Sequence, residues 1–294
     1  AAYLSSQCKV FVAPAMDLDM YSHPANQKNL ETLSDFGVVV LPTEEGFLAS
    51  GLHGKGRMME PESIIAFMEK DIYKTLPLKN KKVVITAGPT QEAIDPVRFI
   101  GNNSSGKMGF ELAKRAADLG AEVILISGPT NLSIKHVNIK LEQVVTADQM
   151  FESSKKHYVD ASVFIASAAV ADFKPDNNAT QKIKKGTGFD QINLLPTPDI
   201  LAYLGKIKKD QFLVGFALET ENELENAKGK LESKNLDAII LNSLNDEQAG
   251  FGGNQNKITY LQPNVNPISF ELKTKQEVAV DVFDQILLKY EKLS

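Results

Sequence analysis

Glycines, amides, hydroxyls and one lysine, Lys107, occur together between Gly101 and Gly109, in the order GNNSSGKMG. At the start of a helix, free backbone N–H groups and the positive end of the helix dipole bind anions such as phosphate. The spacing of the glycines and Lys107 matches most of a P-loop. However, Met108 stands where a P-loop has the Ser or Thr that holds magnesium. We therefore expect an anion site that is not an ordinary P-loop. The alternative is a polar turn that only caps a helix.

A second candidate site follows a predicted strand at residues 161–166. The small residues at 167–170 would let a ligand approach the backbone closely, and Asp172 could accept hydrogen bonds from a ribose or a base. The alternative is that residues 167–170 begin a packed helix.

Two groups of lysines are candidates for binding phosphate. Lys182, Lys184 and Lys185 lie in a polar stretch without apolar periodicity, which predicts a mobile loop. Clustered lysines usually form only a solvated face, but these follow a candidate ligand edge, which favours a phosphate role. Lys230 and Lys234 share one face of a predicted charged helix. The alternative for this second group is an exposed, salt-bridged surface.

The first candidate site lies between two predicted strands and beside a predicted helix. A β-branched run at residues 83–86 ends at Gly88, which is typical of a buried strand followed by a turn. Ser104 and Ser105 form a candidate N-cap, and Gly120 stands where a helix C-cap belongs. A second strand is predicted at residues 123–126. Such a unit is a right-handed crossover, so its tip lies at the carboxyl edge of a parallel sheet.

The alternation of strands and helices continues to the carboxyl terminus. We expect helices at residues 147–158, 197–204, 221–233 and 275–290, strands at 161–166, 212–216 and 238–241, and a β-hairpin within 250–273. This pattern predicts an α/β fold, a Rossmann-like, doubly wound and mostly parallel sheet from about residue 78 onward.

The amino-terminal part follows the same α/β logic. Strands are expected at residues 8–13 and 37–42, and helices at 23–35 and 62–73. Residues 44–61 are glycine-rich and are predicted to be irregular, either as a lid or binding loop or as a disordered insertion. The sequence TLPLKNKK, with its proline and lysines, marks the clearest domain boundary.

Composition excludes several classes of function. The chain has 294 residues, which favours two domains, and a net charge of -5 that gives no basic surface for nucleic acid. The single cysteine, Cys8, excludes a disulfide framework and fits a reducing, cytoplasmic setting. No apolar run approaches the roughly 18 residues that span a bilayer, and no basic segment marks a signal peptide. The chain begins within a helix-then-strand pattern, so we expect the natural protein to extend upstream.

Five ordered motifs resemble bacterial phosphopantothenate-cysteine ligase, the second half of the bifunctional phosphopantothenoylcysteine decarboxylase/phosphopantothenate-cysteine ligase of coenzyme A synthesis. The motifs are DPVRFIGNNSSGKMG at 95–109, SAAVADF at 167–173, KIKK at 182–185, GFALET at 215–220 and KxxxKNLD at 230–237. Several ordered motifs are far more specific than any single one. The resemblance implies a ligase domain at residues 82–294, after a linker at 73–81.

Residues 1–72 resemble the carboxyl-terminal part of the partner decarboxylase, an FMN-dependent flavoprotein. The matching stretches are PAMD at 14–17 and LASGLHGKGRMMEP at 48–61. Two residues depart from the family pattern, because Asp17 stands at the usual Asn and Ser50 at the usual catalytic Cys. The flavin-contacting amino-terminal half of that domain is also missing here. The resemblance therefore implies decarboxylation only by a full-length parent, with FMN not retained by this chain.

The resemblance also implies a reaction and its residues. The family joins 4'-phosphopantothenate to L-cysteine with CTP, through an acyl cytidylate that cysteine then displaces as CMP. Asn102 would stabilise the acyl cytidylate, with Arg98 near the same loop and Lys182, Lys230 and Lys234 on the phosphates. The implied nucleoside site consists of Ala166, Ser167, Ala168, Asp172, Pro198, Asp199, Ile200, Leu201 and Phe216.

Magnesium would bridge the phosphates, although the sequence does not identify its ligands. The ligase half would form a homodimer through its sheet edge and carboxyl-terminal hairpin, with a larger assembly possible in the full-length parent. Two other classes suit the same fold, a nucleotide-binding oxidoreductase and a non-catalytic nucleotide-binding module. The lack of GxGxxG after the strand at residue 82 disfavours the first, and the lysine loop disfavours the second.

Overall fold

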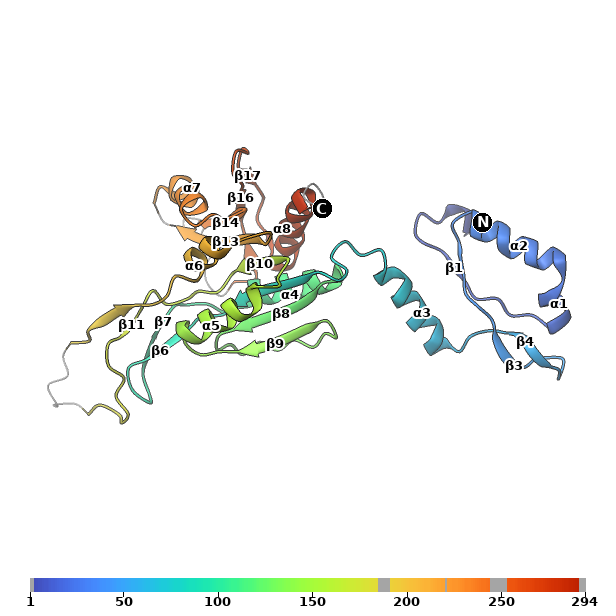
Figure 1. Ribbon diagram of the computed structural model, residues 1–294, viewed down its shortest axis with the longest axis horizontal. Helices are drawn as coiled ribbons and strands as arrows, with labels where there is room; N and C mark the ends of the chain where they lie inside the picture. Colours follow the sequence, from blue (N-terminus) through green and yellow to red (C-terminus); the bar gives the residue numbers. More distant parts are fainter. Residues whose placement is uncertain (1–2, 185–190, 220, 244–252, 291–294) are drawn as a thin grey trace. The chain divides into compact units, whose positions relative to one another are not determined.

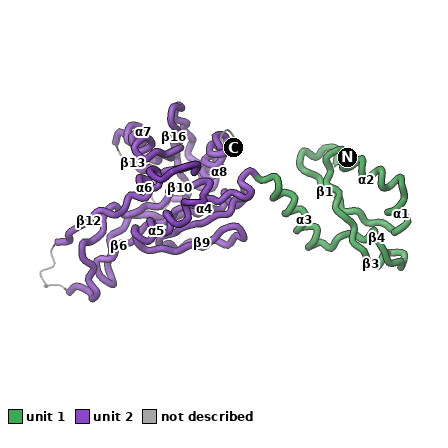
Figure 2. Tube along the Cα trace, in the orientation of Figure 1, with its two compact units in different colours: residues 1–76 green, residues 77–294 purple. Residues whose placement is uncertain are grey.

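The computed structural model describes residues 3–184, 191–219, 221–243 and 253–290. The chain divides into two compact units, Ala1–Leu76 and Pro77–Ser294 (Figure 2). The predicted mobile lysine loop lies partly outside the described residues, because Lys185 and the residues up to 190 are not among them. Within the described ranges, no helix is both long and apolar enough to cross a membrane.

Unit 1 is a small α/β unit with few buried apolar side chains. Its elements are η1 (Tyr3–Ser5), β1 (Phe11–Val12), α1 (Leu18–Ser22), α2 (Pro24–Asp35), β2 (Val39–Val40), β3 (Glu44–Phe47), β4 (His53–Arg57) and α3 (Pro61–Tyr73). β1 and β2 pair in parallel, and β3 and β4 form an antiparallel hairpin. Val38 and Leu41 are the large apolar side chains buried in the described part of this unit.

The prediction that residues 44–61 form an irregular loop is wrong, because most of this segment is the β3–β4 hairpin. Its glycines serve close packing rather than disorder. A Cβ on Gly54 would lie 2.9 Å from the Leu18 side chain, and one on Gly56 would lie 2.3 Å from the Met16 carbonyl oxygen. Gly56 also has a φ of 129°, which L-residues with side chains rarely adopt.

Unit 2 alternates strands and helices along most of its length. Its helices are α4 (Lys107–Asp118), α5 (Ala147–Tyr158), α6 (Ile200–Ile207), α7 (Glu223–Ser233) and α8 (Lys275–Tyr290). Its larger strands are β5 (Lys82–Ala87), β8 (Glu122–Ser127), β9 (Ile139–Gln143), β10 (Val163–Ala166), β13 (Phe212–Glu219), β14 (Ala238–Ser243) and β16 (Ile258–Leu261). Its short strands are β6 (Gln91–Ala93), β7 (Phe99–Gly101), β11 (Phe173–Pro175), β12 (Leu194–Pro196), β15 (Gln255–Asn256), β17 (Ile268–Ser269) and β18 (Lys273–Thr274).

The predicted doubly wound, mostly parallel sheet is confirmed. An eight-stranded sheet has the order β17-β16-β14-β13-β10-β5-β8-β9. The strands from β14 to β9 run parallel, and β16 and β17 are antiparallel, as expected for the carboxyl-terminal hairpin. Because all parallel strands end at one edge, the segments that follow β5, β10 and β13 meet there.

Strand side chains alternate between two apolar layers, one on each face of the sheet. The helices that cover these layers are labelled in Figure 1. Val83 and Ile85 of β5 pack in the layer covered by α4 and α8, whereas Val84 between them packs in the opposite layer with α5, α6 and α7. This period of two explains why the buried strands are continuous runs of β-branched and other apolar residues.

The start of α4 differs from the prediction. Its N-cap is Gly106, with a φ of 76°, and not the predicted serine pair. The serine hydroxyls instead support the turn, because Ser104 Oγ accepts from the Gly106 N–H (3.2 Å) and Ser105 Oγ from the Lys107 N–H (3.5 Å). A side chain at Gly106 would also collide with Thr130, at 2.8 Å, so the helix starts where glycine permits the turn. Gly120 follows the end of α4 with a φ of 92°, as predicted.

Other differences concern short elements. The β6–β7 and β11–β12 hairpins and strand β9 were not predicted, and α6 begins at Ile200 rather than at residue 197 because Asp199 provides its N-cap. The alternative of a helix at residues 167–170 is excluded, since this segment is extended and Ala169 forms a parallel bridge with Pro89.

Candidate functional site

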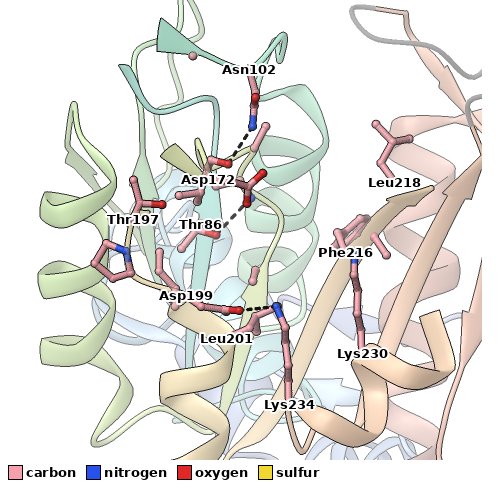
Figure 3. Close-up of a pocket in the computed structure, with 18 of the residues that line it drawn as sticks. Thr86, Asn102, Asp172, Thr197, Asp199, Leu201, Phe216, Leu218, Lys230 and Lys234 are labelled. Carbon is pink, nitrogen blue, oxygen red and sulfur yellow. Dashed lines mark hydrogen bonds and ion pairs between the residues drawn. The ribbon is translucent and has the colours of Figure 1, made fainter. Parts of the chain in front are cut away.

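A cavity of about 810 Å³ opens at the carboxyl edge of the sheet, beyond the ends of β5, β10 and β13 (Figure 3). Its size is in the range of small-molecule sites. The lining residues are Thr86, Gly101, Asn102, Asn103, Ala166, Ala168, Ala169, Val170, Asp172, Thr197, Pro198, Asp199, Ile200, Leu201, Phe216, Ala217, Leu218, Lys230 and Lys234.

Hydrogen bonds from two threonines join the segments that form the cavity floor. Thr86 Oγ1 accepts from the Ala168 N–H (3.3 Å), and Thr90 Oγ1 accepts from the Ala171 N–H (2.9 Å). The Ala169 N–H donates to the Gly88 carbonyl (2.9 Å). The chain after β10 is therefore fixed to the chain after β5, and its small side chains leave the backbone accessible to a ligand.

Asn102 is held at the mouth of the cavity by its own side chain. Its Nδ2 donates to the Val170 carbonyl oxygen (2.8 Å), although the residue is exposed (Figure 3). This bond links the loop before α4 to the loop after β10. The amide is thereby oriented before any ligand binds, which is the condition for stabilising developing charge without reorganisation.

Two lysines of α7 reach the cavity, and each already has an acidic partner. Lys230 pairs with Glu219 of β13 at 2.6 Å. Lys234 pairs with Asp199 at 2.8 Å (Figure 3). Asp199 Oδ1 also accepts from the Ala202 N–H (2.9 Å) as the N-cap of α6. Burial raises the pKa of the Asp199 carboxyl, but the hydrogen bonds from Lys234 and the helix, with the nearby lysine charges, lower it below its ordinary value overall.

Most of the site residues proposed from sequence line this one cavity. They are Asn102, Ala166, Ala168, Asp172, Pro198, Asp199, Ile200, Leu201, Phe216, Lys230 and Lys234. Ser167, Lys182 and Arg98 do not line it, and Ser50 lies in unit 1. Sequence reasoning missed Thr86 and Thr197, although a polar residue at the carboxyl end of a predicted strand was a signal for Thr86.

Arg98 anchors the lysine segment from outside the cavity. Its guanidinium binds the Asp95 carboxylate, with Nε to Oδ2 at 3.0 Å, and it also donates to the Ile183 carbonyl (3.0 Å). The Ile183 N–H donates to the same Asp95 carboxylate (3.2 Å). Lys182 and Lys184 flank Ile183, so this buried carboxylate fixes the start of the lysine segment.

The hydrogen bond from the Arg98 side chain holds the pKa of the Asp95 carboxyl well below its usual range. Burial opposes this effect, and the backbone N–H groups of Val97, Ile183 and Arg98 add to it. Asp95 is thus ionised at neutral pH, and the link to the lysine segment is charge-assisted.

In unit 1, the two residues that depart from the decarboxylase pattern touch each other. Ser50 Oγ donates to Asp17 Oδ1 at 2.9 Å, and the same oxygen accepts from the Leu18 N–H (2.8 Å) at the start of α1. The departures at positions 17 and 50 therefore form one local unit rather than two separate changes.

The described residues form no preformed site for a metal ion, and none that suits a flavin. They contain no group of three or more His, Cys, Asp and Glu side chains placed to hold a metal ion. In unit 1, a cavity of about 380 Å³ lined by Tyr3, Leu4 and Lys9 offers one cation, and Asp71 already pairs with it at 2.5 Å. That donor set does not suit a flavin phosphate.

Comparisons with known proteins agree with the motifs. Residues 78–289 match the family described as DNA/pantothenate metabolism flavoprotein C-terminal domain, and residues 1–73 match the family described as Flavoprotein. The coenzyme A biosynthesis bifunctional protein CoaBC of Bacillus subtilis (strain 168) is 42% identical over 285 residues, covering 96% of this chain and 70% of the relative. A protein from an unknown prokaryotic organism, named cysteine/cysteine sulfinic acid decarboxylase, is 51% identical over 291 residues, covering 97% of this chain and 81% of the relative.

The crystal structure of the C-terminal domain of a CoaBC protein matches the fold, with a TM-score of 0.63 and 40% identity over 74% of this chain and all of that domain. A Cab2 variant solved with phosphopantothenate-cysteine shares the fold at 19% identity, with a TM-score of 0.58 over 80% of this chain and 96% of that one. The resemblance inferred from the five motifs is therefore confirmed. The chain belongs to the family of CoaBC-type bifunctional proteins, with a flavoprotein region followed by a DNA/pantothenate metabolism flavoprotein C-terminal domain.

Proposed function

We propose that unit 2 is a phosphopantothenate-cysteine ligase that uses CTP. The observation that supports this proposal most directly is the cavity at the carboxyl edge of the sheet. The oriented amide of Asn102 lines this cavity together with Lys230 and Lys234. An amide donor and two cations suit a reaction that brings a carboxylate onto a triphosphate. The CoaBC names of several relatives support the same reaction class.

The proposed first step activates the acid. A carboxylate oxygen of 4'-phosphopantothenate attacks the α-phosphorus of CTP, and the bond to the leaving pyrophosphate breaks. In the second step, the amine of L-cysteine attacks the acyl carbon, CMP leaves with the shared oxygen, and the amine loses a proton to solvent. The Asn102 amide would donate to the oxygen on which charge develops, because its position is fixed before the substrates bind.

The nucleoside would lie against the remaining walls of the cavity. Phe216 offers an apolar surface, and the exposed carboxylate of Asp172 is available to accept hydrogen bonds from ribose or base. Lys230 and Lys234 would bind the phosphates as mobile point charges. Lys182 is next to Ile183, which the Asp95–Arg98 pair holds, and is proposed as a further ligand of the phosphates.

Magnesium would arrive with the triphosphate. The protein provides no preformed cage among its described residues, which fits the preference of Mg²⁺ for phosphate oxygens and water with one or two carboxylates. Asp172 is the cavity carboxylate best placed for that role, because Asp199 is committed to Lys234.

The test is turnover by the full chain with 4'-phosphopantothenate, L-cysteine, magnesium and either CTP or ATP. We expect release of pyrophosphate and formation of 4'-phosphopantothenoylcysteine with CTP. Equal or better turnover with ATP would contradict the nucleotide assignment. Calorimetric titration with NAD, NADPH, ATP and CTP separates the ligase from the oxidoreductase and from the non-catalytic module, since only the ligase shows CTP binding together with product formation.

Unit 1 is proposed to retain the fold of a decarboxylase region without its chemistry. A serine hydroxyl is a far weaker acid than a cysteine thiol, and the hydroxyl of Ser50 is occupied by Asp17. Proton donation from position 50 is therefore disfavoured. The decarboxylase name of one relative makes cysteine and cysteine sulfinic acid worthwhile substrates to include beside phosphopantothenoylcysteine in assays of this chain.

The ligase half is proposed to form a homodimer through the edge of its sheet. Strand β17 pairs on one side with β16, and Ile268 and Val265 of that hairpin are exposed, at 38% and 53%. An exposed edge strand with apolar neighbours is a site for pairing with a second copy. Sedimentation should show a dimer at micromolar concentration, and Ile268→Lys should shift it toward the 32.2 kDa monomer. A monomer in the unmodified chain would remove the proposal.

A further inference from the structure

The β6–β7 hairpin leads directly to Asn102, yet it is not part of the central sheet. Its two strands pair with each other as a separate two-stranded sheet (Figure 1). Each strand has only three residues, and an isolated two-stranded hairpin is at best marginally stable in water. Asn102 directly follows the last residue of β7. Its position therefore depends on the contacts that anchor this hairpin.

One of these anchors is the buried carboxylate of Glu92, the middle residue of β6. Glu92 is 3% exposed, and its Oε1 accepts from the Ala147 N–H at 2.7 Å. Ala147 is the first residue of α5 and is fully buried. The first backbone N–H groups of a helix have no acceptor within the helix, and this end of a helix favours negative charge. Glu92 therefore satisfies a buried donor at a place in the helix that accommodates a carboxylate.

Helix α5 also has a cap of its own. Thr146 Oγ1 accepts from the Gln149 N–H (3.2 Å), and Gln149 Oε1 accepts from the Thr146 N–H (3.3 Å), which completes a capping box. Glu92, by contrast, comes from a strand that is 55 residues away in the sequence. The bond between Glu92 and Ala147 is thus a tie between α5 and the hairpin, in addition to the local helix cap.

The pairing of the two short strands connects Glu92 to Asn102. Glu92 lies opposite Ile100, two residues before Asn102. A Cβ on Gly101 would lie 2.7 Å from the Thr90 carbonyl oxygen, so the end of β7 packs closely against the backbone that precedes β6. A shift of β6 is therefore passed to β7 and to the Asn102 loop.

We infer that Glu92 is a positioning residue for the first step of the ligase reaction. Glu92 is not among the residues that line the cavity. Its carboxylate, bound to the start of α5, fixes β6 and β7 so that the Asn102 amide faces the reacting groups. Displacement of a catalytic group by about 1 Å costs about 100-fold in rate, so an anchor outside the cavity controls catalysis. This inference rests on the ligase function proposed above.

The first test removes the anchor in the full chain. We expect Glu92→Ala to slow pyrophosphate release about 10-fold or more. The KM for CTP should change little, because the walls that hold the nucleotide stay in place. Glu92→Gln should keep most of the rate, since the amide oxygen accepts from the same N–H. Loss of release in Glu92→Gln equal to that in Glu92→Ala would contradict a role of this hydrogen bond.

Thr146→Ala is the matched control, because it removes the cap of α5 and leaves the bond between Glu92 and Ala147 in place. It should lower the Tm, as loss of an N-cap does, while pyrophosphate release stays near the unmodified rate. Equal losses of release in Thr146→Ala and Glu92→Ala would show that Glu92 only stabilises α5, and would overturn the inference.

A second variant separates positioning from stability. A buried N–H without an acceptor by itself destabilises Glu92→Ala. Adding Ala147→Pro removes that donor, since proline is favoured at the first position of a helix and Thr146, with a ψ of 162°, has the extended conformation that precedes proline. We expect this double variant to regain Tm without regaining pyrophosphate release. Recovery of release together with the Tm would overturn the inference.

A double-mutant cycle with Asn102 tests the proposed route. Because Glu92 acts through the Asn102 amide, Glu92→Ala should slow pyrophosphate release about 10-fold in the unmodified chain and hardly at all when Asn102→Ala is already present. The same slowing in both backgrounds would mean that Glu92 does not act through Asn102.

Hydrogen exchange without substrates separates the inference from the proposed function. Exchange across residues 99–103 should become faster in Glu92→Ala and stay unchanged in Thr146→Ala. Unchanged exchange in Glu92→Ala would show that the carboxylate does not hold this segment. If the unmodified chain makes no product while exchange behaves as expected, the ligase function fails and the anchoring of Asn102 by Glu92 stands.

Discussion

The lysines of α7 and the lysines that begin α4 and α8 have different partners among the described residues. Lys230 and Lys234, which line the nucleotide cavity, each pair with a carboxylate: Glu219 of β13 for Lys230, and Asp199 of the cavity wall for Lys234. Lys107 and Lys275 have a neutral asparagine between them and no carboxylate among the described residues. Among the described residues, the first group therefore has carboxylate partners, and the second group has a neutral amide oxygen as its partner at Lys107.

The difference indicates how each group would meet an anion. An exposed ion pair stabilises a protein by only about 0 to 1 kcal/mol, so a triphosphate can replace Glu219 or Asp199 at small cost. The internal carboxylates keep the empty cavity close to neutral and compete with weaker anions. At Lys107 the partner among the described residues is a neutral amide oxygen, which carries no charge to compete with an anion.

The largest expected effect comes from placing a new carboxylate in the cavity that Lys230 and Lys234 line. Asn102→Asp should reduce pyrophosphate release about 100-fold, since loss of one oriented donor to developing charge has that order of effect and the new anion repels the phosphates. The KM for CTP should change much less. Single-turnover measurement of pyrophosphate checks this. Asn131→Asp, on an exposed loop outside the cavity, is the control, and unchanged release in Asn102→Asp would remove the role given to Asn102.

A smaller effect is expected when one internal pair is broken. Lys234→Gln should raise the KM for CTP about tenfold, because a charge-assisted contact is lost and Asp199 is left unpaired beside the phosphates. Adding Asp199→Asn should recover part of this loss, since asparagine can still cap α6 through its side-chain oxygen. Steady-state kinetics of both variants, with Lys206→Gln on α6 as control, measures the coupling. Strictly additive effects would show that Asp199 does not compete with phosphate.

Removal of a lysine outside the cavity should have a weaker effect. Lys182→Gln should raise the KM for CTP a few-fold and leave the Tm unchanged, because Lys182 does not line the cavity and makes no core contact. Hydrogen exchange across residues 176–184 should slow when CTP binds if this segment closes over the nucleotide. Equal exchange rates with and without CTP would show that the segment does not respond to the nucleotide.

The sequence predicted the parallel sheet and the cavity walls because these depend on local signals. Runs such as residues 83–86 are buried on both faces, so their apolar character is continuous, and helix α5 has its predicted bounds because Thr146 and Gln149 form a capping box. Small residues after β10 predicted close approach to the backbone, and the extended segment fixed by Thr86 and Thr90 agrees with that prediction.

Features that depend on distant contacts were not predictable from local patterns. The glycines of β3 and β4 resembled a loop because the side chains that exclude a Cβ there, such as Leu18, are far away in sequence. The start of α4 depends on Thr130 in the same way. The role of Arg98 as an anchor for Ile183, and the burial of Lys275, are properties of tertiary neighbours that spacing alone does not contain.

The smallest effect on catalysis, and one with a distinct pH signature, is expected at Asp95. Its pKa is lowered in the folded state, first by the hydrogen bond from Arg98 and against the effect of burial. An unfolded aspartate has a pKa of about 3.9. A group with a lowered folded pKa stabilises the fold above the unfolded value and loses this contribution as the pH falls toward the folded value. Asp95→Asn should therefore lower the Tm at pH 7, and the difference from the unmodified chain should shrink progressively as the pH falls below about 4.

Asp95→Asn tests the lysine segment indirectly. The Asp95 carboxylate binds the backbone of Ile183 next to Lys182, and it does not bind a lysine side chain. The KM for CTP should rise no more than in Lys182→Gln, since the lysine remains and the nucleotide can still order it. Thermal melts from pH 3 to pH 7, with the exposed Asp210→Asn as control, measure the difference. A Tm difference that is the same at both ends of this range would mean that the carboxylate charge does not stabilise the segment, and the buried pair would then act through packing alone.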